Sequence, residues 1–200
     1  MSLIDQIQKG ESKTLELKES LPKNESIAKT IVAFSNTSGG KLIIGVNDQL
    51  SIVGIDDSTL FEIQDKIASI ISDSCFPGII PDIYSVNIEN KLVLVVEVVR
   101  GNQKPYFLKS RGREDGCYVR IGATNRLADS TTIAELERQK HHISYDEEVY
   151  HDLELNRLDM SPLLDKFKQT GKTVTKEKLE NLKLMNYPDA ERSRYQNNVS

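Results

Sequence analysis

The apolar residues at the amino end of the chain predict a short helix followed by a strand. In "MSLIDQIQKG" (1–10) they fall on one side of a helix. In "TLELK" (14–18) apolar and polar residues alternate, as expected when successive side chains point to opposite faces of an extended chain. This period of two predicts a β-strand that carries Glu16 on one face.

The next two elements are separated by a pair of glycines. Apolar residues return to helical spacing in "IAKTIVAFSN" (27–36), and Ser26 is placed to cap the amino end of that helix. Two glycines at 39–40 follow, as is common just past the carboxyl end of a helix. The apolar run "KLIIGVND" (41–48) predicts a buried strand, and "SIVGI" (51–55) predicts a short strand that pairs with it.

Further along the chain, the pattern predicts a helix and then a hairpin. The segment "STLFEIQDKIASIISDS" (58–74) keeps the spacing of an amphipathic helix. The runs "DIYSVNIEN" and "KLVLVVEVVR" (82–100) predict two antiparallel strands that turn at Glu89 and Asn90. Asn suits this place because it tolerates the left-handed backbone of a tight hairpin.

The elements that follow complete the pattern of one fold class. The runs "KPYFLKS" (104–110) and "GCYVRIG" (116–122) predict a second hairpin around the polar tip "RGREDG", and residues 130–142 predict a final helix. Long helices mixed with hairpins indicate an α+β fold. We therefore expect a mixed, mainly antiparallel β-sheet with packed helices over residues 1–143.

The character of the sequence changes after this domain. Residues 144–200 are charged and poor in β-branched pairs, which predicts a small helical extension that serves as a connector. The segment "TGKT" (170–173) is interpreted as a turn, because Lys166 stands where a phosphate-binding loop has its first glycine. The sequence ends without a recognisable cap or core, so we expect a piece of a longer protein with a truncated downstream region.

Composition narrows the class of protein. The 200 residues are 38% hydrophobic and 28% charged, as in an ordinary globular domain. No apolar run approaches the roughly 18–20 residues that span a bilayer, and the amino end lacks the features of a signal peptide. Cys75 and Cys117 have no metal-ligand spacing, which favours buried thiols in a reducing compartment. We expect a cytoplasmic protein with no membrane partner.

The net charge is −4, but the basic residues are unevenly distributed. Residues 100–126 hold seven of them against two acids. Such a segment is compatible with one positive face that follows a phosphate backbone, with tyrosines offering stacking contacts. The alternative is an exposed hairpin whose aromatic residues partly face the core. The candidate nucleic-acid-binding residues are Lys104, Lys109, Arg111, Arg113, Tyr118, Arg120 and Arg126.

Three acids form a second candidate site. Glu16 and Asp48 lie at predicted strands, and Glu11 lies just upstream of the first. If the two strands are neighbours, the three carboxylates can converge, and clustered carboxylates bind Mg²⁺ or Mn²⁺. Such a metal activates water for attack on a phosphodiester. Lys18 shares a strand face with Glu16 and suits a phosphate contact. The alternative is that all four are solvated strand and loop charges.

Four blocks, in this order, carry a family resemblance: "ESKTLELKESL", "IAKTIVAFSNTSGGKLIIGVND", "SIVGID" and "KPYFLKSRGREDGCYVRIGATNRLA". Together they resemble the Schlafen AlbA_2 family over roughly residues 10–140. The resemblance implies a DNA-binding domain, since bacterial members are commonly regarded as transcriptional regulators or helicase-related proteins. Animal members use this domain as an RNase, and the positions of their acidic triad map onto Glu11, Glu16 and Asp48.

Three functions remain open at this point. The leading hypothesis is a nucleic-acid (DNA) binding domain of a bacterial transcriptional regulator. The second is a Mg²⁺- or Mn²⁺-dependent endoribonuclease in which Glu11, Glu16 and Asp48 are the metal ligands and Lys18 lies beside them. A single copy would then need a partner chain, because a duplicated domain completes the RNA-holding cleft of the animal enzymes. The third is an oligomerisation module that forms a homo-oligomer.

Overall fold

The computed structural model describes residues 2–141, 159, 161–171, 175 and 178. The chain divides into two units, residues 1–142 and 143–200, and each is described by itself. In the second unit the described helix is α6 (Ser161–Gln169). Most of the predicted helical connector, with Lys172 and Thr173 of "TGKT", lies outside the described residues.

A mixed sheet forms the centre of the first unit. Its strands are β1 (Leu15–Lys18), β2 (Gly40–Ile44), β4 (Asp82–Ile88) and β5 (Lys91–Val98). They lie in the order β1-β2-β5-β4. β1 and β2 run parallel, whereas the other neighbouring pairs are antiparallel. This arrangement confirms the mixed, mainly antiparallel sheet expected for an α+β fold.

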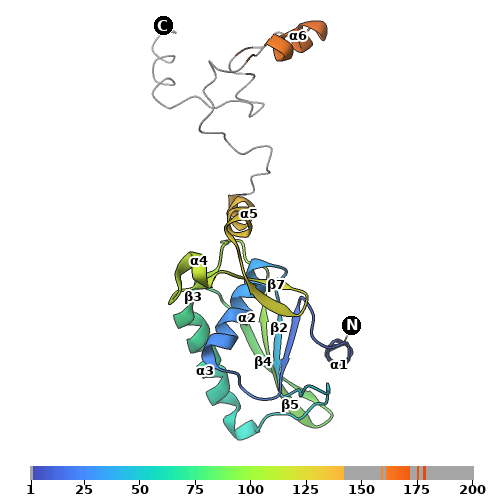
Figure 1. Ribbon diagram of the computed structural model, residues 1–200. Helices are drawn as coiled ribbons and strands as arrows, with labels where there is room; N and C mark the ends of the chain where they lie inside the picture. Colours follow the sequence, from blue (N-terminus) through green and yellow to red (C-terminus); the bar gives the residue numbers. More distant parts are fainter. Residues whose placement is uncertain (1, 142–158, 160, 172–174, 176–177, 179–200) are drawn as a thin grey trace, which may run out of the picture. The chain divides into compact units, whose positions relative to one another are not determined.

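Helices pack on both faces of this sheet because side chains alternate in direction along each strand. On one face, α2 (Asn24–Asn36) and α3 (Leu60–Ser74) lie side by side and share a core with Leu42 (Figure 1). On the other face, α1 (Leu3–Gln8) contributes Ile7 to a core with Ile43 and its neighbours. The alternating direction of the side chains along β1 and β2 therefore decides which core each residue joins.

The remaining elements are η1 (Asp57–Thr59), β3 (Cys75–Phe76), β6 (Phe107–Leu108), α4 (Gly112–Gly116), β7 (Tyr118–Ile121), β8 (Thr124–Leu127) and α5 (Ser130–His141). Of these elements, β6, β7 and β8 contact α2, whereas η1 contacts α3. β3 pairs with β6, and β7 pairs with β8, so each forms a two-stranded sheet. A third core joins this region to α5 through Cys117, Ile133 and Leu136.

Several sequence predictions are confirmed. The helices expected at 58–74 and 130–142 are α3, preceded by η1, and α5. The hairpin of β4 and β5 turns at Glu89 and Asn90, whose φ angles of 53° and 62° are left-handed. Asn90 tolerates that conformation, and the two-residue loop sets the register of the whole hairpin.

The predicted cap of α2 is wrong. The helix begins at Asn24, with Lys23 at the N-cap position and no side-chain capping bond. The N–H of Ser26 donates to the carbonyl of Lys23 at 2.9 Å, so Ser26 already lies in the first turn. Because its N–H is used within that turn, Ser26 cannot be the residue outside it.

The strand predicted at 51–55 is only partly present, since its pairing with 41–48 is reduced to one bridge. The segment makes only two isolated bridges among the described residues, Val46 with Ile52 and Ile55 with Leu92. Gly45 and Gly54 adopt φ angles of 106° and 80°, which bend the chain away from an extended ladder. The segment crosses the end of the sheet without joining it as a strand.

The predicted hairpin of 104–110 with 116–122 does not form. The "RGREDG" tip folds into α4, and the two runs pair elsewhere, as β6 with β3 and β7 with β8. Asn36 lies between them and donates through Nδ2 to the carbonyls of Tyr106 and Tyr118, at 2.8 and 2.9 Å. One side chain thus takes the acceptors that a direct ladder would use.

Candidate functional site

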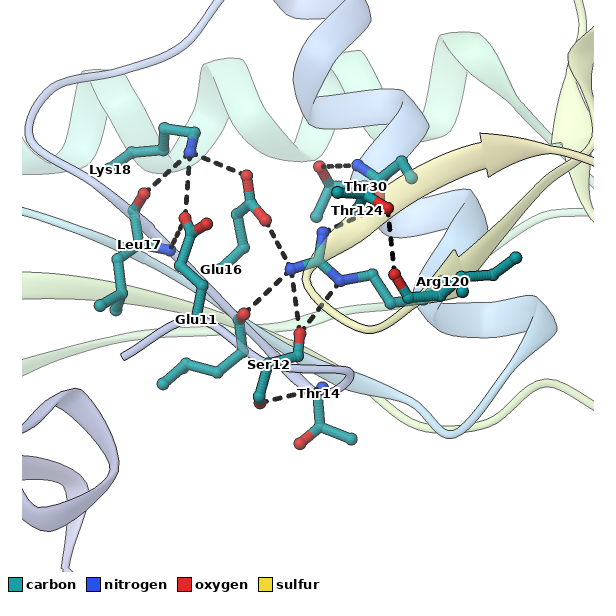
Figure 2. Close-up of polar contacts among 12 residues, drawn as sticks. Glu11, Ser12, Thr14, Glu16, Leu17, Lys18, Thr30, Arg120 and Thr124 are labelled. Atoms are coloured by element: carbon teal, nitrogen blue, oxygen red, sulfur yellow. Dashed lines mark hydrogen bonds and ion pairs between the residues drawn. The ribbon is translucent and has the colours of Figure 1, made fainter. Parts of the chain in front are cut away.

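Two of the three candidate acids meet at a lysine (Figure 2). Nζ of Lys18 lies 2.8 Å from Oε1 of Glu16 and 3.3 Å from Oε1 of Glu11. Glu16 and Lys18 share one face of β1 because they are two residues apart. The same Glu11 oxygen accepts from the N–H of Leu17 at 3.1 Å, which fixes the approach to the strand. The predicted proximity of Glu11, Glu16 and Lys18 is present.

Arg120 completes this cluster from β7. Its Nη2 lies 2.7 Å from Oε2 of Glu16 and donates to the carbonyls of Ser12 and Leu15 at 3.0 and 3.1 Å. The guanidinium also lies 5.2 Å from the ring centre of Phe34. Arg120 is 3% exposed and Glu16 is 8% exposed. We name Glu11, Glu16, Lys18 and Arg120 the ion-pair cluster.

Both carboxylate oxygens of Glu16 are therefore held by cations. Oε2 accepts no aligned hydrogen bond, so its 2.7 Å contact with Arg120 is an ion pair. Burial alone would lower the pKa of Lys18, but the hydrogen bond and charge of Glu16, with those of Glu11, outweigh it and raise that pKa. The ammonium of Lys18 is thus held in its charged form between two carboxylates.

Asp48 does not belong to this cluster. It lies exposed in the turn that follows β2, where the side chain of Asn47 accepts from the N–H groups of Gln49 and Ser51. Over the described residues, no three His, Cys, Asp or Glu side chains are grouped to hold a metal ion. Since cations already hold Glu16, these residues as arranged do not fit Mg²⁺ or Mn²⁺.

Three of the predicted nucleic-acid contacts are buried. Arg120 is part of the ion-pair cluster. Tyr118 is 9% exposed, and Nζ of Lys29 lies 5.4 Å from the centre of the Tyr118 ring. Lys104 is 2% exposed and donates to Gln139. These side chains serve the interior of the unit, so the alternative interpretation of the segment, with aromatic residues facing the core, holds for Tyr118.

The other four candidates are exposed. Arg111 pairs with Glu25 of α2, and Arg113 pairs with Glu137 of α5. Lys109 donates to the carbonyl of Ser72 at 2.8 Å. Nε of Arg126 donates to the hydroxyl of Thr124 at 3.3 Å. Of these four exposed residues, Arg111 and Arg113 are thus paired with carboxylates, whereas Lys109 and Arg126 contact neutral oxygens.

Two features of this region were missed from the sequence. Asn36, 2% exposed at the end of α2, both accepts from the N–H of Tyr106 at 2.7 Å and donates to two carbonyls. In the sequence, Asn36 could have been noticed as a polar residue at the end of an apolar helical stripe. Arg100 is exposed and donates to Gln139 at 3.0 Å. Only its place in the basic segment pointed to it.

An open groove of about 370 Å³ lies beside the glycine pair. Its lining includes Ser38, Gly39, Gly40, Lys41 and Arg100. Gly39 has a φ of 76°, and a Cβ there would lie 2.7 Å from the carbonyl oxygen of Val98. The glycine therefore lets the chain leave α2 and pass against β5, which forms one wall of the groove.

The cysteines are buried and free, as predicted. Burial raises the pKa of Cys75 to about 12 and that of Cys117 to about 11. Because the thiolate is the nucleophilic form, neither thiol is activated for chemistry. Among the described helices, none is both long enough and apolar enough to cross a bilayer.

Comparisons with known proteins identify a family for this chain. The family model of Schlafen, AlbA_2 matches residues 11–129. The N-terminal domain of a RecG-related protein from Nitrosomonas europaea is 27% identical, with a TM-score of 0.47 over 63% of this chain and 90% of that one. The DIP2311 protein from Corynebacterium diphtheriae is 19% identical, with a TM-score of 0.48 over 78% of this chain and 33% of that one. No curated protein matches the sequence. Since the family match spans more than half of its residues, the chain belongs to the Schlafen AlbA_2 family.

Proposed function

We propose that this chain is the nucleic-acid-binding domain of a DNA-binding regulator. The observation that carries the proposal is a set of exposed cations in residues 100–126 whose partners are neutral. Among the described residues, Arg100, Lys109 and Arg126 each contact only an amide, carbonyl or hydroxyl oxygen. A neutral oxygen leaves the positive charge uncompensated, so a phosphate can replace it with a gain in electrostatic attraction.

Two further arginines can join this set of cations at little cost. Arg111 and Arg113 are exposed and pair with exposed or half-exposed glutamates. Such surface pairs are worth about 0–1 kcal/mol. A phosphate with better geometry can therefore exchange with Glu25 or Glu137. This adds candidate contacts to the set without requiring the fold to change.

Fluorescence anisotropy with mixed-sequence duplex DNA and RNA tests this function. We expect binding at low salt that weakens steeply as salt rises, because phosphate contacts release counterions. Replacing Lys109 and Arg126 together should weaken binding, whereas Lys66→Ala, an exposed lysine of α3, should leave it unchanged. Absence of binding to either nucleic acid at low salt contradicts the proposal. A stable dimer in light scattering, together with that absence, would support the oligomerisation alternative.

The endoribonuclease alternative rests on one observation, the contact of Glu11 and Glu16 with the same ammonium. Asp48 would have to approach them, and Lys18 would have to withdraw, for a metal to bind. Incubation of structured RNA with Mn²⁺ tests it. Cleavage that disappears in Asp48→Ala, and persists in the exposed control Asp57→Ala, would establish the nuclease. Activity that is equal in both variants would identify a contaminant.

A further inference from the structure

Two cations converge on one neutral oxygen beside the groove. Nη2 of Arg100 and Nζ of Lys104 donate to the same atom, Oε1 of Gln139, at 3.0 and 2.9 Å. Lys104 is 2% exposed, whereas Arg100 is exposed and lines the groove. Two positive charges that share one acceptor must lie close together, and they repel each other.

No carboxylate compensates these charges within the described part of the chain. The nearest acid in the hydrogen-bond network is Glu135, which accepts from Nε2 of Gln139 at 3.1 Å. Glu135 is itself engaged by Arg138 at 2.7 Å. Burial of a cation against a neutral partner alone is unfavourable, because its hydration is lost without a counter-charge. Such an arrangement has an unmet requirement for an anion.

We propose that Arg100 and Lys104 form a phosphate-binding site in which a phosphate oxygen replaces Oε1 of Gln139. Gln139 holds the acceptor position when no anion is present and turns aside when one binds. The proposal rests on the proposed function only in assigning that phosphate to a nucleic acid. The anion site itself follows from the two cations and their shared acceptor.

Arg100 is the member of this site that also lines the groove. Arg100 lies at its wall, next to the backbone of Gly39, which contacts Val98 and Arg100 so closely that only glycine fits. Lys41 also lines the groove, but Glu97 already neutralises it at 3.2 Å. The attraction for an anion therefore comes from Arg100 and, behind it, from Lys104.

The charge of the site indicates which phosphate it prefers. Arg100 and Lys104 contribute two uncompensated positive charges, which match a dianion better than the single charge of a backbone phosphodiester. A terminal phosphate of a nucleic acid and inorganic phosphate share this chemistry. We therefore expect an oligonucleotide with a 5′-phosphate to bind more tightly than the same oligonucleotide with a 5′-hydroxyl.

The acid–base behaviour of Lys104 agrees with such a site. Burial, followed by the charge of Arg100, lowers the pKa of Lys104 to about 8. The other charged groups of the network are Glu135 and Arg138, which pair with each other. A bound anion favours the charged ammonium and so raises its pKa, which means that binding takes up a proton near pH 8. Phosphate affinity should therefore fall as the pH rises above 8.

Titration of the full chain with sodium phosphate, followed by thermal shift and calorimetry, tests the site. Sodium chloride at equal ionic strength is the reference, because chloride supplies screening without the phosphate geometry. We expect a phosphate-specific rise in melting temperature. Arg100→Gln and Lys104→Met should each weaken phosphate binding about tenfold or more, as expected for loss of a charge-assisted hydrogen bond. The control Lys66→Met should bind as the parent does.

Gln139→Ala distinguishes a phosphate site from a purely structural pair. If Gln139 occupies the position of the anion, its removal should maintain or increase phosphate affinity. Equal effects of phosphate and chloride, or phosphate binding that survives both Arg100→Gln and Lys104→Met, would overturn the proposal and leave the cations as caps for the carboxyl end of α5. If Lys104→Met fails to fold, Arg100→Gln and Gln139→Ala still decide the question.

A parallel titration with 5′-phosphorylated and 5′-hydroxyl oligonucleotides separates this proposal from the proposed function. Nucleic acid that binds equally well to the parent and to Arg100→Gln, with no preference for the 5′-phosphate, would retain the function and reject the site. Specific binding of inorganic phosphate without any oligonucleotide binding would retain the site and reject the function.

Discussion

Nη2 of Arg120 lies 2.7 Å from Oε2 of Glu16, and both side chains are almost fully buried. This ion pair joins β7 to β1, two strands of different sheets. The same guanidinium also satisfies the carbonyls of Ser12 and Leu15. An arginine predicted to contact nucleic acid is instead a structural link between the basic segment and the edge of the main sheet.

Arg120→Met should therefore be strongly destabilising. It leaves a buried carboxylate with one cation and removes one of the donors to each of two carbonyls. Breaking a buried pair costs about 3–5 kcal/mol. Urea unfolding followed by circular dichroism measures the free energy of unfolding. Arg126→Met, on the exposed side of the same hairpin, should change it by less than about 0.5 kcal/mol. Similar losses in both variants would contradict this role of Arg120.

The raised pKa of Lys18 predicts a stability loss at high pH. A group whose pKa is raised on folding stabilises the folded state fully below its unfolded pKa, here 10.5. That contribution is lost as the pH rises through the folded pKa. Lys18→Met should be less stable than the parent at pH 7 by about 1 kcal/mol, the upper end for a partly exposed pair. Urea unfolding across pH 7–11 should show the two proteins converging above pH 10.5.

Lys104 should show the opposite dependence on pH. Its folded pKa of about 8 lies below the ordinary value of 10.5, so the unfolded chain binds more protons between these two values. Stability of the parent should rise with pH over that range. Lys104→Met should be more stable than the parent at pH 7, by about 1 kcal/mol, the lower end of the cost of an uncompensated buried polar group. The difference should shrink as the pH approaches 10.5 in phosphate-free buffer.

Gly39→Ala should be more destabilising than the same change at another left-handed glycine. Gly112 has a φ of 72°, and a Cβ added there would meet no described atom within 4 Å, so its replacement costs only the backbone conformation, about 1–2 kcal/mol. At Gly39, with a φ of 76°, the methyl group would also meet backbone atoms of Val98 and Arg100. Thermal unfolding of the two variants measures the difference. Equal losses would mean that β5 moves away freely.

The salt dependence of DNA binding should report individual phosphate contacts. Each lysine or arginine that contacts a phosphate contributes about one unit to the slope of log affinity against log salt concentration. Lys109→Ala and Arg126→Ala should each reduce that slope by about one and weaken binding uniformly across sequences. Anisotropy titrations at several salt concentrations measure it. An unchanged slope in both variants would place the DNA elsewhere.

Elements with strong local signals could be predicted from the sequence. α3 and the hairpin of β4 and β5 follow from helical spacing and from a turn that tolerates left-handed residues. β3 and β6 could not, because each has two residues and finds its partner from a distant segment. A two-residue strand has no measurable period, so its pairing depends on tertiary contacts.

The same distinction applies to the candidate site. Glu11, Glu16 and Lys18 lie within eight consecutive residues, so their proximity depends on the local chain alone. Arg120 comes from another sheet, and its burial depends on β7 packing against α2. The sequence does not distinguish the buried basic residues of this segment from the exposed ones. Their exposure depends on how the segment packs against α2 and α5.

The side chain of Asn36 has a consequence for folding. Its amide bonds to residues 70 and 82 positions further along the chain, so both segments must arrive before its hydrogen bonds are complete. Loops of this length close slowly compared with helix formation. Segment 104–118 should therefore acquire amide-hydrogen protection after α2 in a refolding experiment. The cations of this segment therefore reach their final positions late, and a nascent chain would present them in that arrangement only after both segments have reached Asn36.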